Sequence, residues 1–377
     1  MKEVYITRVS KFLPNDAVEN DQIEARLGLI NGKPSRAKNI VLRSNKIKSR
    51  YYAINEQGAL THNNTQLTSE AIRALCDSDF KADDIELLSC GTSTPDQLLP
   101  AHASMVHGEL KGGNMEVNSA SGVCCAGMNA LKYGYLSVMT EQVSNAVCSG
   151  SERVSTWIKS DAYEDEIAHL SDLENNPILA FNKDFLRWML SDGAGAMLLE
   201  NEPKGKFPLK IEWMEGFSYA YEMETCMYAG GEKRKDGSMK PWSEYAPNSW
   251  SKESVFAIKQ DTKLLGDHIL TKGVDSLKKA ITKNGVAPED ITYYLPHISS
   301  YFFKDGLYEE MKKQGVDIPL ENWFLNLDRV GNIGSASIYV MLEELVNSGQ
   351  LKKGDRILLS VPESARFSYT YAFLTVC

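Results

Sequence analysis

The sequence predicts an α/β fold in which one βαβ unit occurs twice. Lys81–Cys90 and Ala287–Pro296 each combine an acidic turn with a short apolar strand. Gly122–Leu136 and Gly331–Leu345 each combine a turn of small residues with a segment whose apolar positions have helical spacing. Because these features recur in the same order, they indicate a duplication. We therefore expect pseudo-twofold halves with mostly parallel sheets that are buried on both faces.

The remaining elements keep the same order in each half. The chain opens on a predicted strand within Met1–Ile6. The helix of the first half is followed by apolar segments at Val143–Cys148 and Gly193–Leu199, and that of the second by Arg356–Val361 and Tyr369–Val376. In such an arrangement the corresponding loops of the two halves converge, so we expect one site between them.

Two polar stretches, Asp161–Asn176 and Gly230–Trp250, interrupt this order. Both are predicted to be plain connections between elements. For the second stretch, the alternative is a loop at the entrance to the site or at a subunit contact, because long loops are often functional.

The composition is that of an ordinary globular protein. Of the 377 residues, 43% are hydrophobic, which is enough for a large core. No stretch approaches the about 18 apolar residues of a membrane span, and the first residues lack a secretion signal, so we expect a cytoplasmic protein. Seven cysteines without a CxxC pair indicate neither a disulfide framework nor a zinc site. The net charge of −9 argues against a nucleic-acid binder.

The segment from Lys33 to Arg50 is strongly basic, although the chain is acidic overall. Because this segment contains no Asp or Glu, it is predicted to attract phosphates or an acidic partner. The alternative is an ordinary solvated surface. Its basic residues are Lys33, Arg36, Lys38, Arg43, Lys46, Lys48 and Arg50.

Cys125 is the best candidate for a nucleophile. It lies where a turn of small residues meets the predicted helix that includes Asn129–Met139. A thiol at a helix N-terminus is expected to have a pKa below its free value of about 8.5, because the unpaired backbone N–H groups stabilise the thiolate. The alternative is a buried structural cysteine, since free Cys behaves as a small hydrophobe.

Two further polar residues stand at positions typical of functional sites. His297 ends an apolar strand, where open α/β sheets place their chemistry. Asn332 lies among glycines that permit an unusual backbone beside a ligand. Each residue alone is equally consistent with a structural hydrogen bond or a cap.

Together, the three segments resemble a known family. Gly-Val-Cys-Cys-Ala-Gly-Met, Leu-Pro-His and Gly-Asn-Ile-Gly-Ser-Ala-Ser-Ile resemble the nucleophile, histidine and asparagine segments of the β-ketoacyl-acyl-carrier-protein synthase III family of the thiolase superfamily. Ser191-Asp192-Gly193-Ala194-Gly195-Ala196 is similar to the motif that closes that family's first half. The resemblance spans essentially the whole chain. It implies a five-layered αβαβα thiolase-like fold, with the nucleophile in residues 1–205 and the histidine and asparagine in residues 206–377.

The resemblance also implies a chemistry. The family nucleophile directly precedes Ala-Gly, which selects Cys125 and leaves Cys124 as a packing residue. Cys125 would attack an acyl thioester, with the oxyanion held by backbone N–H groups, and His297 and Asn332 would stabilise the enolate of a second thioester. The expected substrates are phosphopantetheine thioesters of acyl carrier protein or coenzyme A, with no tightly bound cofactor and no metal. The basic segment would then bind the carrier, and a homodimer is expected.

The chain departs from the family at two places. After His297 the usual Gln-Ala-Asn is replaced by Ile298-Ser299-Ser300. The family's glycine-rich turn near the C-terminus is replaced by a segment with a new carboxyl group, Glu363, which is a candidate base or substrate-orienting group, or else a structural carboxylate. Backbone N–H groups of Ser364 or Ala365 are accessory candidates for the oxyanion site.

These departures favour a specialised enzyme. The chain is similar to ketosynthases of dialkylresorcinol and flexirubin pathways, which implies condensation of a β-ketoacyl thioester with a second acyl thioester and cyclisation to a 2,5-dialkylcyclohexane-1,3-dione. The main alternative is a housekeeping synthase III that starts fatty acid synthesis with a malonyl carrier protein. A papain-like cysteine hydrolase shares the residue order but not the local cysteine signature. A non-catalytic member of the superfamily would typically lack the nucleophile.

Overall fold

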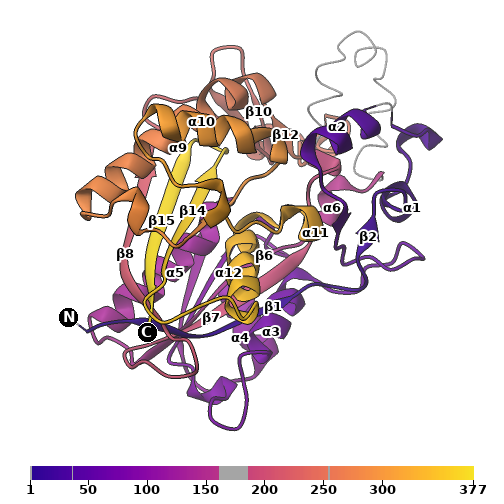
Figure 1. Ribbon diagram of the computed structural model, residues 1–377. Helices are drawn as coiled ribbons and strands as arrows, with labels where there is room; N and C mark the ends of the chain where they lie inside the picture. Colours follow the sequence, from indigo (N-terminus) through magenta and orange to yellow (C-terminus); the bar gives the residue numbers. More distant parts are fainter. Residues whose placement is uncertain (1, 36, 161–185, 254) are drawn as a thin grey trace.

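A single nine-stranded sheet runs through both halves of the protein. The computed structural model describes residues 2–35, 37–160, 186–253 and 255–377 (Figure 1). The strand order is β13-β14-β15-β8-β1-β7-β6-β4-β5, so the antiparallel pairing of β1 with β8 joins the two halves. The strands are β1 (Tyr5–Phe12), β4 (Leu87–Thr92), β5 (Glu116–Ser121), β6 (Asn145–Glu152), β7 (Gly193–Glu200), β8 (Leu209–Ser218), β13 (Tyr293–Pro296), β14 (Arg356–Glu363) and β15 (Ser368–Val376).

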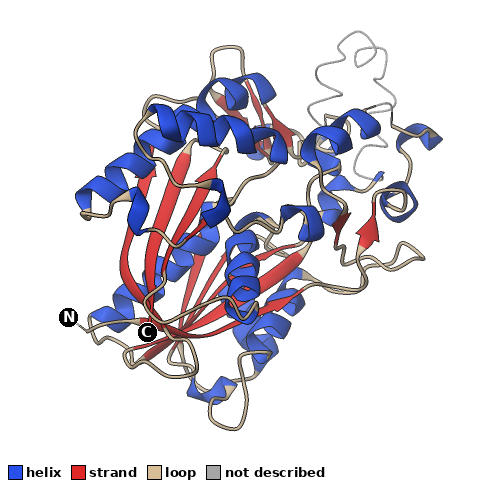
Figure 2. Cartoon of the chain, in the orientation of Figure 1, coloured by secondary structure: helices blue, strands red, loops and turns tan. Residues whose placement is uncertain are grey.

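Helices alternate with the two parts of the sheet in five layers (Figure 2). The two central helices contact strands of both halves: α5 contacts β4 and β6 as well as β14 and β15, and α12 contacts β1 and β7 as well as β13. The outer layers cover β6 and β7 on one side and β14 and β15 on the other. The predicted thiolase-like αβαβα fold is therefore confirmed. The central helices are α5 (Cys125–Met139) and α12 (Ser337–Asn347), and the outer helices are α3 (Asn64–Arg73), α4 (His102–Leu110), α9 (Thr262–Lys283) and α10 (Lys304–Lys313).

The internal repeat is visible in the order of elements. The series β4, α5, β6, β7 corresponds to β13, α12, β14, β15. Each first strand is preceded by a short 3-10 helix, η2 (Ala82–Asp84) or η7 (Pro288–Asp290), in which an aspartate accepts a backbone N–H three residues earlier. The predicted boundary at residue 205 lies between β7 and β8. One hydrophobic core spans both halves, with members such as Leu131 and Leu342, so the halves do not pack as separate bodies.

The prediction of mostly parallel sheets was wrong. Only three neighbouring pairs are parallel, namely β4 with β5, β4 with β6, and β13 with β14, and the other pairs in the large sheet are antiparallel. The closing strand of each half is the reason. β14 and β15 are joined by only residues 364–367, whereas a parallel crossover needs about a dozen residues or more.

Smaller elements flank this framework. Residues 18–50 pack with α6 and with residues around Trp188 in a separate apolar cluster. Gly230–Trp250, which was predicted to be a connection, contains a small antiparallel hairpin, while Asp161–Asn176 lies outside the described residues. No helix in the described part of the chain is long and apolar enough to cross a membrane. The remaining strands and α-helices are β2 (Val18–Glu19), β3 (Ser49–Arg50), β9 (Met227–Tyr228), β10 (Gly231–Lys233), β11 (Met239–Pro241), β12 (Lys259–Gln260), α1 (Ile23–Leu27), α2 (Lys38–Asn45), α6 (Ser155–Ile158) and α11 (Leu327–Val330).

Candidate active site

Glycines allow the start of α5 to approach the loop that leads into α12. A Cβ added at Gly127 or at Gly150 would lie 2.3 Å from the same backbone oxygen, that of Ser335. The hydroxyl of Tyr339 in α12 donates a 2.7 Å hydrogen bond to the carbonyl of Gly127. The two halves therefore meet at the N-terminal ends of their central helices, as the repeat predicted.

His297 is held at the end of β13. Its backbone N–H donates to the carbonyl of Ser360 at 2.8 Å, which extends the pairing of β13 with β14. The side chain is 3% exposed, and Nε2 has no hydrogen-bond partner among the residues that the structure describes. Burial lowers the pKa of His297 to about 4, so the imidazole is neutral near pH 7 and one of its two nitrogens carries a proton.

Asn332 is fixed through its backbone. Its N–H donates to the carbonyl of Met189 and its carbonyl accepts from Ser191, at 2.9 and 2.8 Å. Oδ1 accepts the N–H of Gly334 at 2.9 Å, so the side-chain amide is oriented by its oxygen and keeps its N–H groups for donation. The preceding Gly331 has φ 71°, and a Cβ there would lie 2.9 Å from Cβ of Ser191.

His297 and Asn332 line one cavity. Cys124 and Val123 from the start of α5 line it too, as does Ser360 from β14. The cavity extends from these polar groups to the underside of α9, where its walls are apolar. No group of three or more His, Cys, Asp or Glu side chains suited to a metal ion occurs among the residues whose positions are described.

Cys125 is not among the residues that line this cavity. Its thiol donates to the carbonyl of Val361 at 3.3 Å, and Oγ1 of Thr370 donates to Sγ at 3.4 Å. Cys124, which was expected only to pack, is the cysteine in the cavity wall. The structure therefore brings His297 and Asn332 together with Cys124 and places Sγ of Cys125 against β14 and β15.

The expectation of a lowered thiol pKa for Cys125 was also wrong. Cys125 is 2% exposed, and burial raises its pKa, as does the nearby carboxylate of Glu363. Burial likewise raises the pKa of the Cys124 thiol. Desolvation disfavours a thiolate more strongly here than the helix N-terminus favours it.

Glu363 caps the start of α5. Its Oε2 accepts the backbone N–H groups of Val123 at 2.9 Å and Cys125 at 3.0 Å. The side chain is 9% exposed, and burial raises the pKa of its carboxyl group. The carboxylate thus occupies the backbone N–H of Cys125, which is therefore not free to hold an oxyanion in this structure.

The two accessory candidates beside Glu363 have different environments. Ser364 lines the cavity, and its Oγ accepts a hydrogen bond from Nε2 of Gln260 at 3.1 Å. Ala365 uses its carbonyl to accept the backbone N–H of Cys226 at 2.8 Å, which anchors the turn between β14 and β15.

A second buried carboxylate, Glu152, was not predicted. It lines the cavity and is 0% exposed. It accepts hydrogen bonds from Oγ of Ser93 at 2.7 Å, Oγ1 of Thr94 at 2.8 Å and the backbone N–H of Ser335 at 3.2 Å. Burial raises its pKa. The sequence feature that could have indicated Glu152 is its position as a lone acidic residue shortly after the apolar segment Val143–Cys148.

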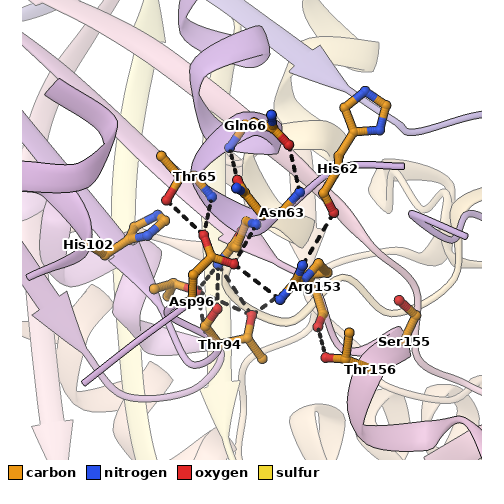
Figure 3. Close-up of polar contacts among 12 residues, drawn as sticks. His62, Asn63, Thr65, Gln66, Thr94, Asp96, His102, Arg153, Ser155 and Thr156 are labelled. Carbon is orange, nitrogen blue, oxygen red and sulfur yellow. Dashed lines mark hydrogen bonds and ion pairs between the residues drawn. The ribbon is translucent and has the colours of Figure 1, made fainter. Parts of the chain in front are cut away.

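A polar network supports the loop that carries Thr94 (Figure 3). Asp96 accepts the backbone N–H groups of Asn64 and Thr65, at 2.9 and 2.8 Å, where α3 begins. It also forms an ion pair with Arg153 at 3.2 Å, and the backbone N–H of Arg153 donates to Oγ1 of Thr94 at 2.8 Å. The loop after β4 is therefore tied both to α3 and to the end of β6.

The basic segment is only partly a surface feature. Arg50 is 0% exposed and donates to Oδ1 of Asn20 and the carbonyl of Trp188, so its inclusion in a binding patch was wrong. Lys38 forms an ion pair with Glu24 at 3.0 Å. Arg36 lies outside the described residues. The members that are exposed are Lys33, Arg43, Lys46 and Lys48.

Comparisons with known proteins agree with this fold. The family model described as 3-oxoacyl-[acyl-carrier-protein] synthase III C terminal matches residues 281–362, which include His297 and Asn332. A β-ketoacyl-[acyl-carrier-protein] synthase III from Clostridium perfringens is 25% identical over 363 residues, covering 95% of each chain.

Solved structures show the same fold. The tetronic acid condensing enzyme AbyA1 superposes with a TM-score of 0.76 at 20% identity, covering 99% of both chains. OleA from Xanthomonas campestris, in a structure with bound lauric acid and lauroyl-CoA, has a TM-score of 0.71 at 19% identity, again covering 99% of both chains.

The fold is that of thiolase-fold enzymes, and the relatives that align over most of the chain, together with the matched family model, indicate an acyltransferase that forms carbon–carbon bonds. The matched C-terminal model and the curated relatives support, more narrowly, a ketosynthase III-like enzyme of the thiolase superfamily.

Proposed function

We propose that this enzyme joins two acyl thioesters by a Claisen condensation through an acyl-cysteine intermediate. The observation that carries the proposal is the cavity shared by His297, Asn332 and Cys124, which directly precedes Cys125 at the start of α5. The substrates are phosphopantetheine thioesters of acyl carrier protein or coenzyme A, as the names of the curated relatives and of the OleA complex suggest.

The chemistry proceeds in two steps. The cysteine thiolate attacks the first thioester, the carrier thiol leaves, and an acyl-enzyme results. The second thioester then forms an enolate, either by losing an α-proton to a base or by losing CO2 from a carboxylated α-carbon, and donated hydrogen bonds from His297 and Asn332 stabilise the negative oxygen. The α-carbon attacks the acyl-cysteine, forms the new carbon–carbon bond and releases the cysteine as thiolate.

Cys125 is the proposed nucleophile because it holds the family position before Ala-Gly. For this role its sulfur must turn from Val361 into the cavity, and Glu363 must release the N–H of Cys125 so that this group can hold the oxyanion. Cys124 already lines the cavity and is the competing candidate.

Intact-mass spectrometry distinguishes the two cysteines. After incubation with octanoyl-CoA, the wild-type enzyme and Cys124→Ala should each gain one acyl group, and Cys125→Ala should gain none. Loss of acylation in Cys124→Ala alone would move the nucleophile to Cys124. Acylation that survives in the double variant Cys124→Ala/Cys125→Ala would refute an acyl-cysteine at this site.

A specialised reaction is the favoured form of this activity. We infer that the second substrate is a β-ketoacyl thioester, whose α-carbon is acidic enough to be activated without loss of CO2. Glu363 is the proposed base, because it is a buried carboxylate of raised pKa beside the cysteine pair. Ring closure of the product would then give a 2,5-dialkylcyclohexane-1,3-dione, as in dialkylresorcinol and flexirubin formation.

The second candidate is a housekeeping synthase III that uses a malonyl carrier protein, which the names of the curated relatives favour. Mass analysis of the products separates the two. A cyclic dione from a β-ketoacyl carrier protein and an acyl thioester supports the specialised reaction. A linear β-keto product with release of CO2 from malonyl carrier protein supports the housekeeping one.

We further propose that two copies associate through β5. This strand is an edge of the large sheet, and Val117 on it is 39% exposed. Leu98 and Leu99, in the loop supported by Asp96, are 74% and 85% exposed. The four exposed basic residues of the segment 33–48 are the proposed contact for an acidic carrier protein. A cytoplasmic location remains a prediction.

A further inference from the structure

We propose that the hydroxyl of Ser364 binds the β-keto oxygen of the second substrate and thereby selects β-ketoacyl thioesters over acyl thioesters that lack this oxygen. Gln260 is the residue that holds the hydroxyl in position. This inference rests on the proposed function and deepens it, because it assigns the group that recognises the substrate class.

Ser364 faces the same cavity as the groups proposed to stabilise the enolate. Ser360, Pro362 and Ser364 all line this cavity, as expected from the alternation of side chains along β14 and into the turn that follows it. Glu363, between the last two, is not among the lining residues, and its carboxylate accepts the N–H of Cys125 at 3.0 Å. Ser364 therefore lies next to the proposed base and on the face of the strand that a substrate can contact.

The hydroxyl of Ser364 can still donate a strong hydrogen bond. Its oxygen accepts a hydrogen bond from Nε2 of Gln260 at 3.1 Å, which uses one of its two lone pairs. The hydroxyl in turn donates to Sδ of Met227 at 3.9 Å, and a thioether sulfur is a weak acceptor. A carbonyl oxygen of a ligand is a stronger acceptor, so it would take this hydrogen in place of the sulfur.

Backbone contacts fix both partners of this hydrogen bond. Gln260 of β12 pairs with Met227 of β9. The turn that carries Ser364 is anchored to the residue before Met227, because the carbonyl of Ala365 accepts the N–H of Cys226 at 2.8 Å. Both polar side chains are thus held by the same small sheet, so little has to reorganise when a ligand oxygen binds.

The surroundings of this polar pair make a single donor important. Most of the other residues that line the cavity are apolar, such as Met227, Ile258 and Leu265. A keto oxygen that enters such a cavity loses its hydrogen bonds to water, which costs free energy unless a protein donor replaces them. The hydroxyl of Ser364 supplies this replacement. A plain acyl chain has no such oxygen and gains nothing from Ser364.

The same hydrogen bond assists the proposed reaction. When the carboxylate of Glu363 takes a proton from the α-carbon, the electron pair of that C–H bond is shared by the thioester oxygen and the keto oxygen. His297 and Asn332 are proposed to stabilise the thioester oxygen, and Ser364 stabilises the keto oxygen. The hydroxyl therefore contributes both to binding and to the activation of the α-carbon.

Binding of unreactive substrate analogues to the full-length enzyme tests the proposal. The amide analogues of 3-oxooctanoyl-CoA and octanoyl-CoA carry NH in place of the thioester sulfur, so no acyl group is transferred. Calorimetry gives the dissociation constant of each analogue for the wild type, for Ser364→Ala and for Ser243→Ala. Ser243, which is exposed on η5 (Trp242–Glu244), is the matched control for the loss of a serine hydroxyl.

The wild type and Ser243→Ala should bind the keto analogue about tenfold more tightly than the octanoyl analogue. In Ser364→Ala this preference should vanish, because the keto oxygen loses its donor, whereas the octanoyl analogue should bind as before. Gln260→Met should reduce the preference, since its side chain no longer orients the hydroxyl. An equal preference in the wild type and Ser364→Ala would overturn the assignment. Equal weakening of both analogues in Ser364→Ala would also overturn it, because the hydroxyl would then bind the pantetheine arm that they share.

A second readout separates this inference from the proposed function. Intact-mass kinetics measures acylation of the wild type by octanoyl-CoA. Keto-selective binding that depends on Ser364, without any acyl-enzyme, would support the keto site and refute the covalent chemistry. An acyl-enzyme that forms without any keto preference in binding would overturn the role of Ser364 and leave the acyl-cysteine chemistry in place.

Discussion

Two buried carboxylates at the site differ in what they can do. Glu152 accepts hydrogen bonds from two hydroxyls and from the backbone N–H of Ser335, so its oxygens are occupied and it supports the loop that carries Asn332. Glu363 accepts two backbone N–H groups, and both bonds go to Oε2. Glu363 is therefore the carboxylate that is better placed to exchange partners during a reaction.

The variant Glu363→Gln tests separately how Glu363 affects the pKa of the Cys125 thiol and whether Glu363 acts as a base. Loss of the negative charge lowers the pKa of Cys125, because the carboxylate disfavours the thiolate. We expect iodoacetamide to alkylate Cys125 faster in Glu363→Gln at pH 8. Condensation of a β-ketoacyl thioester should fall by about 10²-fold or more, since a general base contributes 10²–10⁴.

The exposed Glu253→Gln is the matched control and should change neither rate. Normal condensation in Glu363→Gln would reject Glu363 as the base. An unchanged alkylation rate would mean that the charge of Glu363 does not affect the pKa of the Cys125 thiol.

At the scale of elements, the contact between α5 and the loop before α12 determines the geometry of the site. Gly127→Ala places a methyl group against the backbone oxygen of Ser335, which cannot move as a flexible side chain could. We expect a loss of about 1–3 kcal/mol in the free energy of unfolding, the usual range for overpacking. Denaturant titration followed by circular dichroism measures it.

Gly108→Ala in α4 is the control for helix propensity. Residue 108 is exposed and a Cβ there meets nothing within 4 Å, so this variant should gain up to about 1 kcal/mol. Equal stability of the two variants would show that the contact between the central helices tolerates a methyl group.

At the scale of the whole molecule, two buried histidines make stability depend on pH. Burial lowers the pKa of His102 and of His297 to about 4, whereas an unfolded histidine titrates near 6.5. The unfolded chain therefore binds more protons in this window, and stability is lost as pH falls from 6.5 toward 4. Each histidine contributes a slope of about 1.4 kcal/mol per pH unit.

Asp192 acts in the opposite direction, because burial raises its pKa to about 6 and the folded state then binds its proton more readily. A comparison of variants isolates the histidine term. His102→Gln should show a shallower loss of unfolding free energy between pH 6.5 and 4 than the wild type. If the unfolding free energy of His102→Gln fell with pH as steeply as that of the wild type, the lowered pKa of buried His102 would be contradicted.

Association of two copies is tested at the edge of the sheet. Val117→Lys brings two like charges together if β5 pairs with β5 of a second copy, and edge-strand lysine discourages such pairing. We expect the mass in solution, measured by light scattering, to fall from dimer to monomer. Ile40→Lys, at an exposed position of α2, should leave the mass unchanged. A dimer that survives Val117→Lys would place the interface elsewhere.

Local patterns in the sequence determined much of this protein. The repeated acidic turns and apolar strands predicted the duplicated halves, because turn chemistry and hydrophobic periodicity act over a few residues. The segments around His297 and Asn332 likewise predicted two groups that share the cavity. The antiparallel closing strands escaped this reasoning, because apolar runs indicate burial but carry no strand direction.

Only the tertiary structure decided which groups face the cavity. The two cysteines are adjacent in sequence, and their orientation depends on β14 and β15, which pack against α5 from more than 230 residues away. The same packing places the carboxylate of Glu363 on the N–H of Cys125. Contacts with Asn20 and Trp188 bury Arg50, which composition alone assigned to the surface. Side-chain direction and burial arise from contacts between distant segments, and no local pattern encodes them.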